Sequence, residues 1–157
     1  MKSKVYLETT FVSLLTAWPS RVLVRAGHQQ STRDWWKKRR HDFELFVSGL
    51  VLDEAKQGDA QAAQDRLDVI AGLPVLTITD QTIRLTEKIL QTKCIPPKAA
   101  SDASHIAVAA VHQMHFLLTW NFKHINNATI AGEIEDACSR AGFRCPVICT
   151  PDELMGD

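Results

Sequence analysis

The sequence predicts an α/β fold in which helices cover both faces of a parallel β-sheet. Short apolar runs of strand length alternate along the chain with longer segments that have helical periodicity. Such alternation is typical of strand–helix–strand units, whose strands pair in parallel. The 157 residues contain no internal repeat and no Pro-, Gly- or Ser-rich linker. We therefore expect residues 1–157 to form a single domain.

The N-terminal part of the chain begins this alternation. The apolar run KVYL at Lys4–Leu7 predicts a buried first strand, followed by a short apolar helix near Phe11–Ala17 that Pro19 interrupts. A long polar helix is expected at about Arg21–Arg40, and FELFV at Phe43–Val47 predicts the second strand.

The next segment predicts two helices and a third strand. Ser48 is of a residue type that caps helices, and the helix that follows it should end at Gly58. A second helix is expected over Asp59–Gly72, where Leu67, Ile70 and Ala71 share one side. The run VLTI at Val75–Ile78 predicts the third strand.

The C-terminal half continues the pattern. Asp80–Thr92 has apolar residues at helical spacing, and Pro96-Pro97 ends this helix. The remaining predictions are a helix at Ala103–His115, a strand at Phe116–Thr119, a helix near Thr129–Ala141 and a strand at Pro146–Cys149. Thr150-Pro151-Asp152-Glu153 matches a capping box with Pro at the first helical position, so a terminal turn of helix is expected.

The composition excludes several classes of protein. With 45% apolar and 23% charged residues, the chain is neither disordered nor embedded in a membrane. No apolar stretch approaches the roughly 20 residues that span a bilayer, and the N-terminus lacks a secretory signal, so we expect a cytoplasmic protein. Eighteen basic and eighteen acidic residues cancel. Any nucleic-acid partner must therefore be held by a local patch or through metal ions.

Four polar side chains follow strand-like runs or begin the next helix: Glu8, Glu54, Asp102 and Asn121. Because the carboxyl ends of parallel strands face one crevice, we expect these side chains to gather there. Carboxylates so gathered repel one another unless a divalent cation compensates them, and hard oxygen ligands select Mg²⁺ or Mn²⁺ over Zn²⁺. Such a site can activate water and stabilise charge on a phosphodiester.

Each of the four has an alternative structural interpretation. Glu8 could simply end a strand, and Glu54 could be a solvated helix residue paired with a nearby cation. Asp102 could cap a helix or favour its positive end, and Asn121 could be an ordinary turn residue. The functional interpretation depends on their combination.

Other chemistries fit the sequence less well. The motifs of phosphate-binding glycine loops and of serine nucleophile elbows are absent. His105 and His112 could share a helix face with Asp102, but a zinc site needs more ligands, so a structural or surface role is favoured. Trp35 and Trp36 would point about 100° apart on a helix. One should pack in the core, while the other joins a protein interface or, less favoured, stacks on RNA.

Three blocks of the sequence together resemble a known family. VYLETTFVSLL is similar to an opening strand followed by acid-x-Ser/Thr, and FVSGLVLDEAKQGD to a second block with Ser48 and Glu54. SDASHIAVAAVHQMHFLLTWNFKHI resembles an Asp that opens a helix before a strand ending in Thr-x-acid. Over nearly its whole length the chain resembles a PIN-domain protein, the ribonuclease fold of many toxins of bacterial type II toxin–antitoxin pairs.

The resemblance implies a three-layer α/β/α sandwich with a central parallel sheet and a Mg²⁺- or Mn²⁺-dependent endoribonuclease acting on RNA. It also implies an antitoxin protein as partner, and it allows a homodimer. Carried over position by position, the metal-site residues are Glu8, Glu54 and Asp102, the fourth acid's place is taken by Asn121, and the supporting hydroxyls are Thr10 and Thr119.

Two positions depart from the family's pattern. The first acid is normally Asp, and Glu8 is one methylene longer. The fourth position holds the neutral Asn121, so the cluster has a formal charge of −3 in place of −4. These departures lead to a second hypothesis, in which a catalytically weakened PIN-like module binds an antitoxin or RNA without cleavage.

Overall fold

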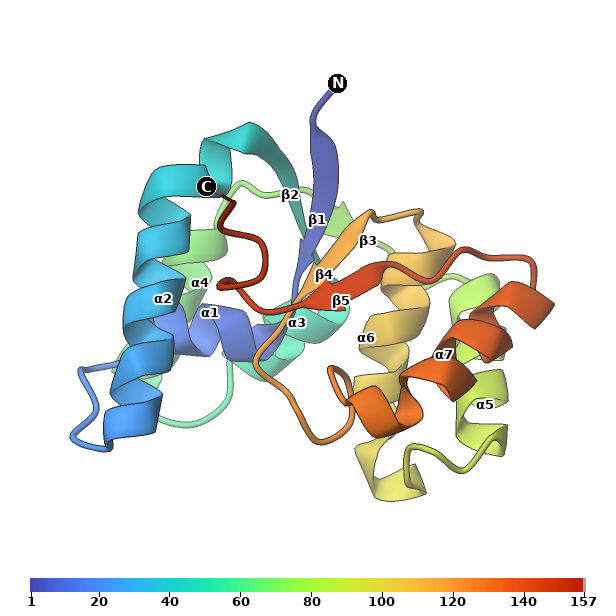
Figure 1. Ribbon diagram of the computed structural model, residues 1–157. Coiled ribbons are helices and arrows are strands. Elements are labelled where there is room, and N and C mark those ends of the chain that lie inside the picture. Colours follow the sequence, from blue (N-terminus) through green and yellow to red (C-terminus); the bar gives the residue numbers. More distant parts are fainter. Residues whose placement is uncertain (157) are drawn as a thin grey trace.

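The computed structural model describes residues 1–156 and contains one five-stranded sheet with the order β3-β2-β1-β4-β5 (Figure 1). The strands are β1 (Ser3–Leu7), β2 (Phe43–Ser48), β3 (Val75–Leu76), β4 (Phe116–Leu118) and β5 (Val147–Cys149). All four neighbouring pairs are parallel. The predicted parallel sheet is confirmed.

The helices form the crossovers between these strands. They are α1 (Thr9–Thr16), α2 (Leu23–Arg39), α3 (Gly49–Ala55), α4 (Ala60–Ile70), α5 (Asp80–Gln91), α6 (Ala100–Val111) and α7 (Ala128–Arg140), with short 3₁₀ helices at Arg40–Asp42 and Pro97–Ala99. In Figure 1, α1, α2 and α4 lie on one side of the sheet, and α5, α6 and α7 lie on the other. This arrangement confirms the three-layer α/β/α architecture.

The centre of the sheet is also the centre of the core. Val5, Tyr6 and Leu7 of β1 and Leu117 and Leu118 of β4 have no solvent-exposed area. Helices cover these strands on both faces, which is why their sequences are continuous apolar runs without strict alternation. Each fully buried aliphatic side chain stabilises the fold by about 1.5–3 kcal/mol.

The order of the strands creates a crevice between β1 and β4. From β1 the chain proceeds outward through β2 to β3, and it then returns to the other side of β1 to form β4 and β5. The crossovers on the two sides of this switch point lead in opposite directions, so the loops after β1 and β4 separate there. Glu8 follows β1 directly, and its backbone N–H donates to Leu118 O at 3.1 Å.

Several predicted element boundaries differ from the structure, among them the end of α3 at Ala55 and not Gly58 and the end of α6 at Val111 and not His115. Helix α6 begins at Ala100 and not at Ala103, because the 3₁₀ turn at Pro97–Ala99 leads directly into it. Asp102 therefore lies in the first turn of α6. The edge strand β3 ends at Leu76 and not at Ile78, because Thr79 forms a capping box that begins α5.

Of the two predicted helix caps, the one at Ser48 makes no capping hydrogen bond and the one at Thr150 forms. Ser48 occupies the N-cap position of α3, but its hydroxyl makes no capping bond and instead contacts the Tyr6 hydroxyl at 2.8 Å. In the C-terminal capping box, Glu153 N–H donates to Thr150 Oγ1 at 3.4 Å and Thr150 N–H donates to Glu153 Oε1 at 3.1 Å. The box closes a hydrogen-bonded turn over 151–154 without a regular helix.

The two adjacent tryptophans differ as expected. Trp35 is fully buried, and its indole N–H donates to Leu154 O at 3.1 Å. Trp36 is half-buried, with the Arg40 guanidinium 5.3 Å from its ring centroid. Within residues 1–156, no helix has the length and apolar character needed to cross a bilayer.

Candidate functional site

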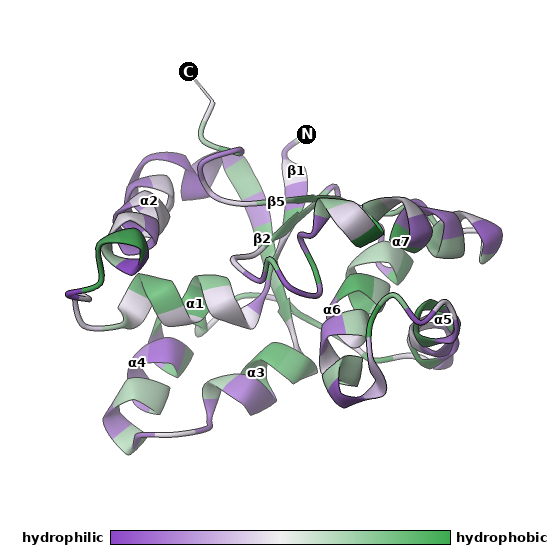
Figure 2. Ribbon diagram, turned by 60° about the horizontal axis from the view of Figure 1, so that its bottom comes forward, coloured by the Kyte–Doolittle hydropathy of each residue, from purple (hydrophilic) through white to green (hydrophobic). Residues whose placement is uncertain are grey.

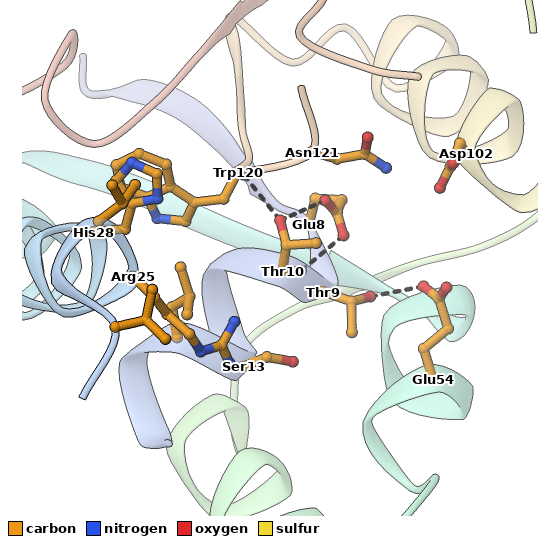
Figure 3. A pocket seen from close by; sticks show the side chains of 13 residues that line it. Glu8, Thr9, Thr10, Ser13, Arg25, His28, Glu54, Asp102, Trp120 and Asn121 are labelled. Carbon is orange, nitrogen blue, oxygen red and sulfur yellow. Dashed lines mark hydrogen bonds between the residues drawn. The ribbon is translucent and has the colours of Figure 1, made fainter. Parts of the chain in front are cut away.

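A pocket of about 490 Å³ opens at the carboxyl edge of the sheet, beside the switch point between β1 and β4. It is lined by Glu8, by residues of α1, α2, α3 and α6, and by the segment after β4. The lining includes all four residues that were predicted to gather, namely Glu8, Glu54, Asp102 and Asn121 (Figure 3).

Glu8 is the most tightly held of the four. It is the N-cap of α1, and its Oε2 accepts a hydrogen bond from Thr10 N–H at 2.8 Å. Its Oε1 accepts from the hydroxyls of Thr10 at 2.7 Å and Thr119 at 2.6 Å. The side chain is only 3% exposed. Thr10 and Thr119 thus both hold the carboxylate of Glu8 in place. Glu8 therefore caps a helix and at the same time lines the pocket.

Glu54 reaches the pocket from the last turn of α3. Its Oε1 accepts from the Thr9 hydroxyl at 2.7 Å and pairs with His105 Nε2 at 2.5 Å. Burial alone would raise the pKa of Glu54, but the hydrogen bond and the charge of His105 outweigh it and lower this pKa. Glu54 is therefore an ionised site residue that is held in place from two sides.

His105 belongs to a buried chain of hydrogen bonds. Its Nδ1 lies 2.6 Å from Tyr6 Oη, which lies 2.8 Å from Ser48 Oγ. Burial by itself would lower the pKa of His105, but the bond to Glu54 and the charges of Glu8, Glu54 and Asp102 raise it above 6.5. When protonated, both ring nitrogens donate, so Tyr6 accepts from His105 and its own hydroxyl can donate to Ser48.

Asp102 and Asn121 complete the acidic side of the pocket. Asp102 lies in the first turn of α6, where the helix dipole favours a negative charge, and it makes no side-chain hydrogen bond with residues 1–156. Asn121 Oδ1 accepts from the backbone N–H groups of Lys123 at 3.1 Å and His124 at 3.0 Å. Asn121 is therefore a turn residue, and its amide nitrogen remains available to the pocket.

Comparison with solved structures identifies similar folds at low sequence identity. The chain matches VapBC2 from Rickettsia felis, bound to a DNA fragment from their promoter, with a TM-score of 0.61 and 14% identity over 94% of this chain and 98% of that chain. The fold is PIN-like. It also matches VapC20 from Mycobacterium tuberculosis, a Sarcin-Ricin loop cleaving toxin, with a TM-score of 0.51 and 17% identity over 82% and 95% of the respective chains.

These matches to VapC PIN-domain toxins confirm the expected fold over most of the chain. No protein-family model matches the sequence, and no curated protein matches it. At such low identity the roles of individual residues in this PIN-like protein must be argued from its own site.

The residue types at the PIN-like site suit a hard divalent cation, but their side chains do not converge on one point. Carboxylate oxygens are the ligands that Mg²⁺ and Mn²⁺ prefer. However, within residues 1–156 no three His, Cys, Asp or Glu side chains converge closely enough to hold a metal ion. Glu8 already accepts three hydrogen bonds, and Glu54 shares one oxygen between two donors. Among residues 1–156, Asp102 makes no side-chain hydrogen bond and Glu54 Oε2 accepts none, so these oxygens could bind a cation without losing a bond.

Two residues that hold Glu54 in this PIN-like fold were not predicted to do so. His105 has the structural role expected of it, being fully buried, but it also pairs with Glu54, and Thr9 donates to the same carboxylate. The spacing of three residues between Asp102 and His105 on one helix was a usable signal, because such residues are neighbours on the helix surface. His112 does have the structural role expected, since its Nε2 contacts Thr77 O at 2.7 Å.

Proposed function

We propose that this PIN-like protein is a metal-dependent endoribonuclease and the toxin of a type II toxin–antitoxin pair. The observation that carries the proposal is the presence of three carboxylates, Glu8, Glu54 and Asp102, with Asn121 in one pocket at the switch point of the sheet. In this proposal residues 1–157 form one domain that acts on RNA in the cytoplasm, and an antitoxin protein restrains it.

The residues have separate tasks in the proposed reaction. Glu8, Glu54 and Asp102 would hold Mg²⁺ or Mn²⁺, which supplies water activation and charge stabilisation on the phosphodiester. Thr10 and Thr119 fix the carboxylate of Glu8.

On the other side of the pocket, Thr9 and His105 fix Glu54. The amide nitrogen of Asn121 is a donor suited to a phosphate oxygen or to a water molecule.

One observation favours a second function, a binding module without cleavage. The carboxylate of Glu8 and the amide oxygen of Asn121 are already used in hydrogen bonds within the protein. A cation would compete with these donors for the same oxygens, and each bond to a charged group that it replaced would cost about 1.5–3 kcal/mol net. If that cost exceeds the gain from coordination, the pocket binds RNA or an antitoxin and cleaves nothing.

The deciding experiment compares Asp102→Asn with wild type in RNA cleavage with Mn²⁺, with Mg²⁺ and with EDTA. Asp80→Asn is the matched control, because Asp80 is likewise an acid in the first turn of a helix but lies outside the pocket. We expect cleavage by wild type and Asp80→Asn that EDTA abolishes. Asp102→Asn should be slower by about 100-fold or more, as when one preorganised electrostatic group is removed from an active site.

Thermal unfolding gives a second readout that does not depend on turnover. A cation that binds only the folded state raises the melting temperature, so Mn²⁺ should stabilise wild type more than Asp102→Asn. Equal cleavage by wild type and Asp102→Asn would remove the nuclease assignment at this pocket. RNA binding by wild type without any cation-dependent cleavage would establish the binding module in its place.

A further inference from the structure

Opposite the carboxylates, the pocket has a wall of aromatic rings. His28 from α2 stacks on Trp120, with ring centroids 4.1 Å apart and an interplanar angle of 17°. Phe122 meets both rings edge-on, at centroid distances of 6.0 Å from His28 and 6.1 Å from Trp120. We call His28, Trp120 and Phe122 the aromatic platform. Figure 3 shows His28 and Trp120 on the side of the pocket away from Asp102.

Hydrogen bonds hold Trp120, the central ring of the aromatic platform. The Trp120 indole N–H donates to Thr32 Oγ1 at 2.8 Å, and that hydroxyl donates to His28 O at 2.7 Å. The Trp120 backbone N–H donates to Thr10 Oγ1 at 2.8 Å. Because the Trp120 ring is tied to α2 and His28 stacks on it, a planar ligand would meet a surface that loses little conformational entropy on binding.

The accessible part of the platform is His28 and Phe122. His28 is half-buried and lines the pocket, Phe122 is 49% exposed just outside the pocket, and Trp120 is 9% exposed and supports His28 from behind. Core aromatic side chains such as Trp35 and Phe11, by contrast, have no solvent-exposed area. A half-exposed ring in contact with two further rings at the pocket is available for stacking with a ligand.

A free cation lies beside the platform. Arg25 is exposed, lines the same pocket and makes no hydrogen bond or ion pair with residues 1–156. In Figure 3 its guanidinium is drawn on the platform side of the pocket, near Ser13. Helix α2 as a whole carries five Lys and Arg residues and a single acid, Asp34. In a chain with no net charge, this helix supplies the local positive field that an anionic polymer requires.

We propose that the aromatic platform and Arg25 form a subsite for one unpaired nucleotide of single-stranded RNA. The base stacks on the His28 ring, which Trp120 supports from behind, and Phe122 contacts the flanking base. Arg25 binds the adjacent phosphate through its planar guanidinium, which matches phosphate oxygens in a bidentate manner. That the ligand is RNA rests on the proposed function. Stacking on the platform further requires that the nucleotide be unpaired, since a base within a duplex has both faces covered by its neighbours.

The position of the subsite relative to the carboxylates supports a nucleotide over a free planar molecule. The pocket has negative groups on one side and a cation with aromatic rings on the other. A nucleotide bound by its base and one phosphate on the platform side would direct the next phosphodiester toward Asp102 and Glu54. A planar molecule without a phosphate would leave Arg25 unused.

The test measures binding of a short fluorescent single-stranded RNA in EDTA, so that affinity is measured without cleavage. We expect Phe122→Ala and His28→Ala each to weaken binding by about tenfold, within the range for loss of one base–aromatic stack. Ile83→Ala is the matched control, because Ile83 on α5 has the same 49% exposure as Phe122 but contacts neither His28 nor Trp120. It should bind as wild type does.

A second arm separates stacking from charge. A duplex of the same sequence should bind wild type more weakly than the single strand, and the platform variants should lose this preference. Arg25→Ala should weaken binding to both RNAs and lower the slope of log affinity against log salt by about one. Circular dichroism of each variant confirms that it is folded.

Three outcomes would overturn the subsite. One is unchanged RNA affinity in folded Phe122→Ala and His28→Ala, and another is equal affinity of wild type for single strand and duplex. The third is a change in oligomeric mass of the platform variants at unchanged RNA affinity, which would assign the platform to a protein interface. These outcomes are distinguishable from failure of the proposed function: a protein that binds single-stranded RNA through the platform but never cleaves it retains the subsite and loses the nuclease.

Discussion

At the scale of single residues, the carboxylate of Glu8 connects stability with the candidate site. It caps α1 and accepts two further hydrogen bonds from hydroxyls, one of them donated by the fully buried Thr119. Thr119 Oγ1 in turn accepts from Asn121 N–H at 3.0 Å. One hydroxyl therefore fixes both Glu8 and the turn that carries Asn121.

Replacing this hydroxyl should be costly. Thr119→Val keeps the shape of the side chain but removes one donor to Glu8 and one acceptor for Asn121. We expect the free energy of unfolding in urea to fall by about 1–3 kcal/mol, the cost of leaving buried polar groups unsatisfied.

The control for this prediction is Thr86→Val, because Thr86 is also buried but its hydroxyl only contacts the carbonyl of Thr82 in its own helix. If both variants lose the same free energy of unfolding, the contacts of Thr119 with Glu8 and Asn121 add no stability beyond that of an ordinary buried hydroxyl.

Restoring a fourth acid at position 121 should strengthen cation binding. Asn121→Asp retains an oxygen that can accept from Lys123 and His124 N–H, and it places a second, charged oxygen where the amide nitrogen lies. Because the cluster gains a negative charge, calorimetric titration should give tighter Mn²⁺ binding than in wild type. Asp102→Asn is the reference of lower charge, and an affinity in Asn121→Asp no higher than in wild type would contradict a cation site here.

At the scale of elements, the hydrogen bonds of His105 join four parts of the fold. Through Glu54, Tyr6 and Ser48, helix α6 is connected to α3, to β1 and to the end of β2. The imidazole is almost fully buried, with 1% of its side chain exposed. The site carboxylate Glu54 is thus anchored through the core and not by its own short helix alone.

The pair Glu54–His105 predicts a definite pH dependence of stability. The pKa of His105 is raised in the folded protein, so its contribution is complete below about 6.5 and is lost as the pH rises through the higher folded value. The pKa of Glu54 is lowered, so its contribution is present above about 4.5 and is lost as the pH falls through the lower folded value. The pair should stabilise most between these two limits.

His105→Gln tests this window, because Gln can still donate to Glu54 but does not titrate. The difference in unfolding free energy between wild type and His105→Gln should be largest between about pH 4.5 and 6.5 and should shrink toward higher pH. His112→Gln, at the end of the same helix, serves as the control, since His112 contacts a neutral carbonyl. A difference that is constant with pH would show that folding does not shift the pKa of His105.

At the scale of the whole molecule, stability should decrease from the centre of the sheet to its β3 edge. β1 and β4 are central and fully buried over most of their length, whereas β3 has two residues, of which Val75 is 47% exposed. Figure 2 shows the contrast between the apolar interior and the polar outer faces of helices such as α5.

Hydrogen exchange followed by NMR should reproduce this gradient. We expect the amides of Tyr6 and Leu117 to exchange only by global unfolding, and the amide of Leu76 to exchange by local opening and therefore at least about tenfold faster. Comparable protection of Leu76 and Tyr6 would mean that the sheet unfolds as one unit up to its edge.

Much of this architecture is predictable from the sequence because period and length are local properties. The apolar runs at Lys4–Leu7 and Phe43–Val47 are strands as expected, and their parallel order follows from the helices between them. The gathering of Glu8, Glu54 and Asp102 in one pocket was also predictable, although only Glu8 directly follows a strand, while Glu54 and Asp102 reach the pocket from helices α3 and α6.

Contacts between distant segments are not local and could not be foreseen. That Ser48 would bond to Tyr6 and leave α3 without a side-chain cap depends on the register of β1 against β2. The stacking of His28 on Trp120 depends on how α2 lies against the end of β4. No pattern along the chain specifies either distance.

The hydroxyl of Thr10 has a thermodynamic consequence for the two sides of the pocket. It accepts from Trp120 N–H at 2.8 Å and donates to Glu8 at 2.7 Å, so one oxygen atom lies between the rings and the carboxylate. A ligand that moves Trp120 therefore changes the environment of Glu8. Such coupling is reciprocal by linkage: the factor by which an RNA changes cation affinity must equal the factor by which the cation changes RNA affinity. A change in cation affinity on adding RNA would then report binding at the proposed RNA subsite, and the reverse measurement would report binding of the cation.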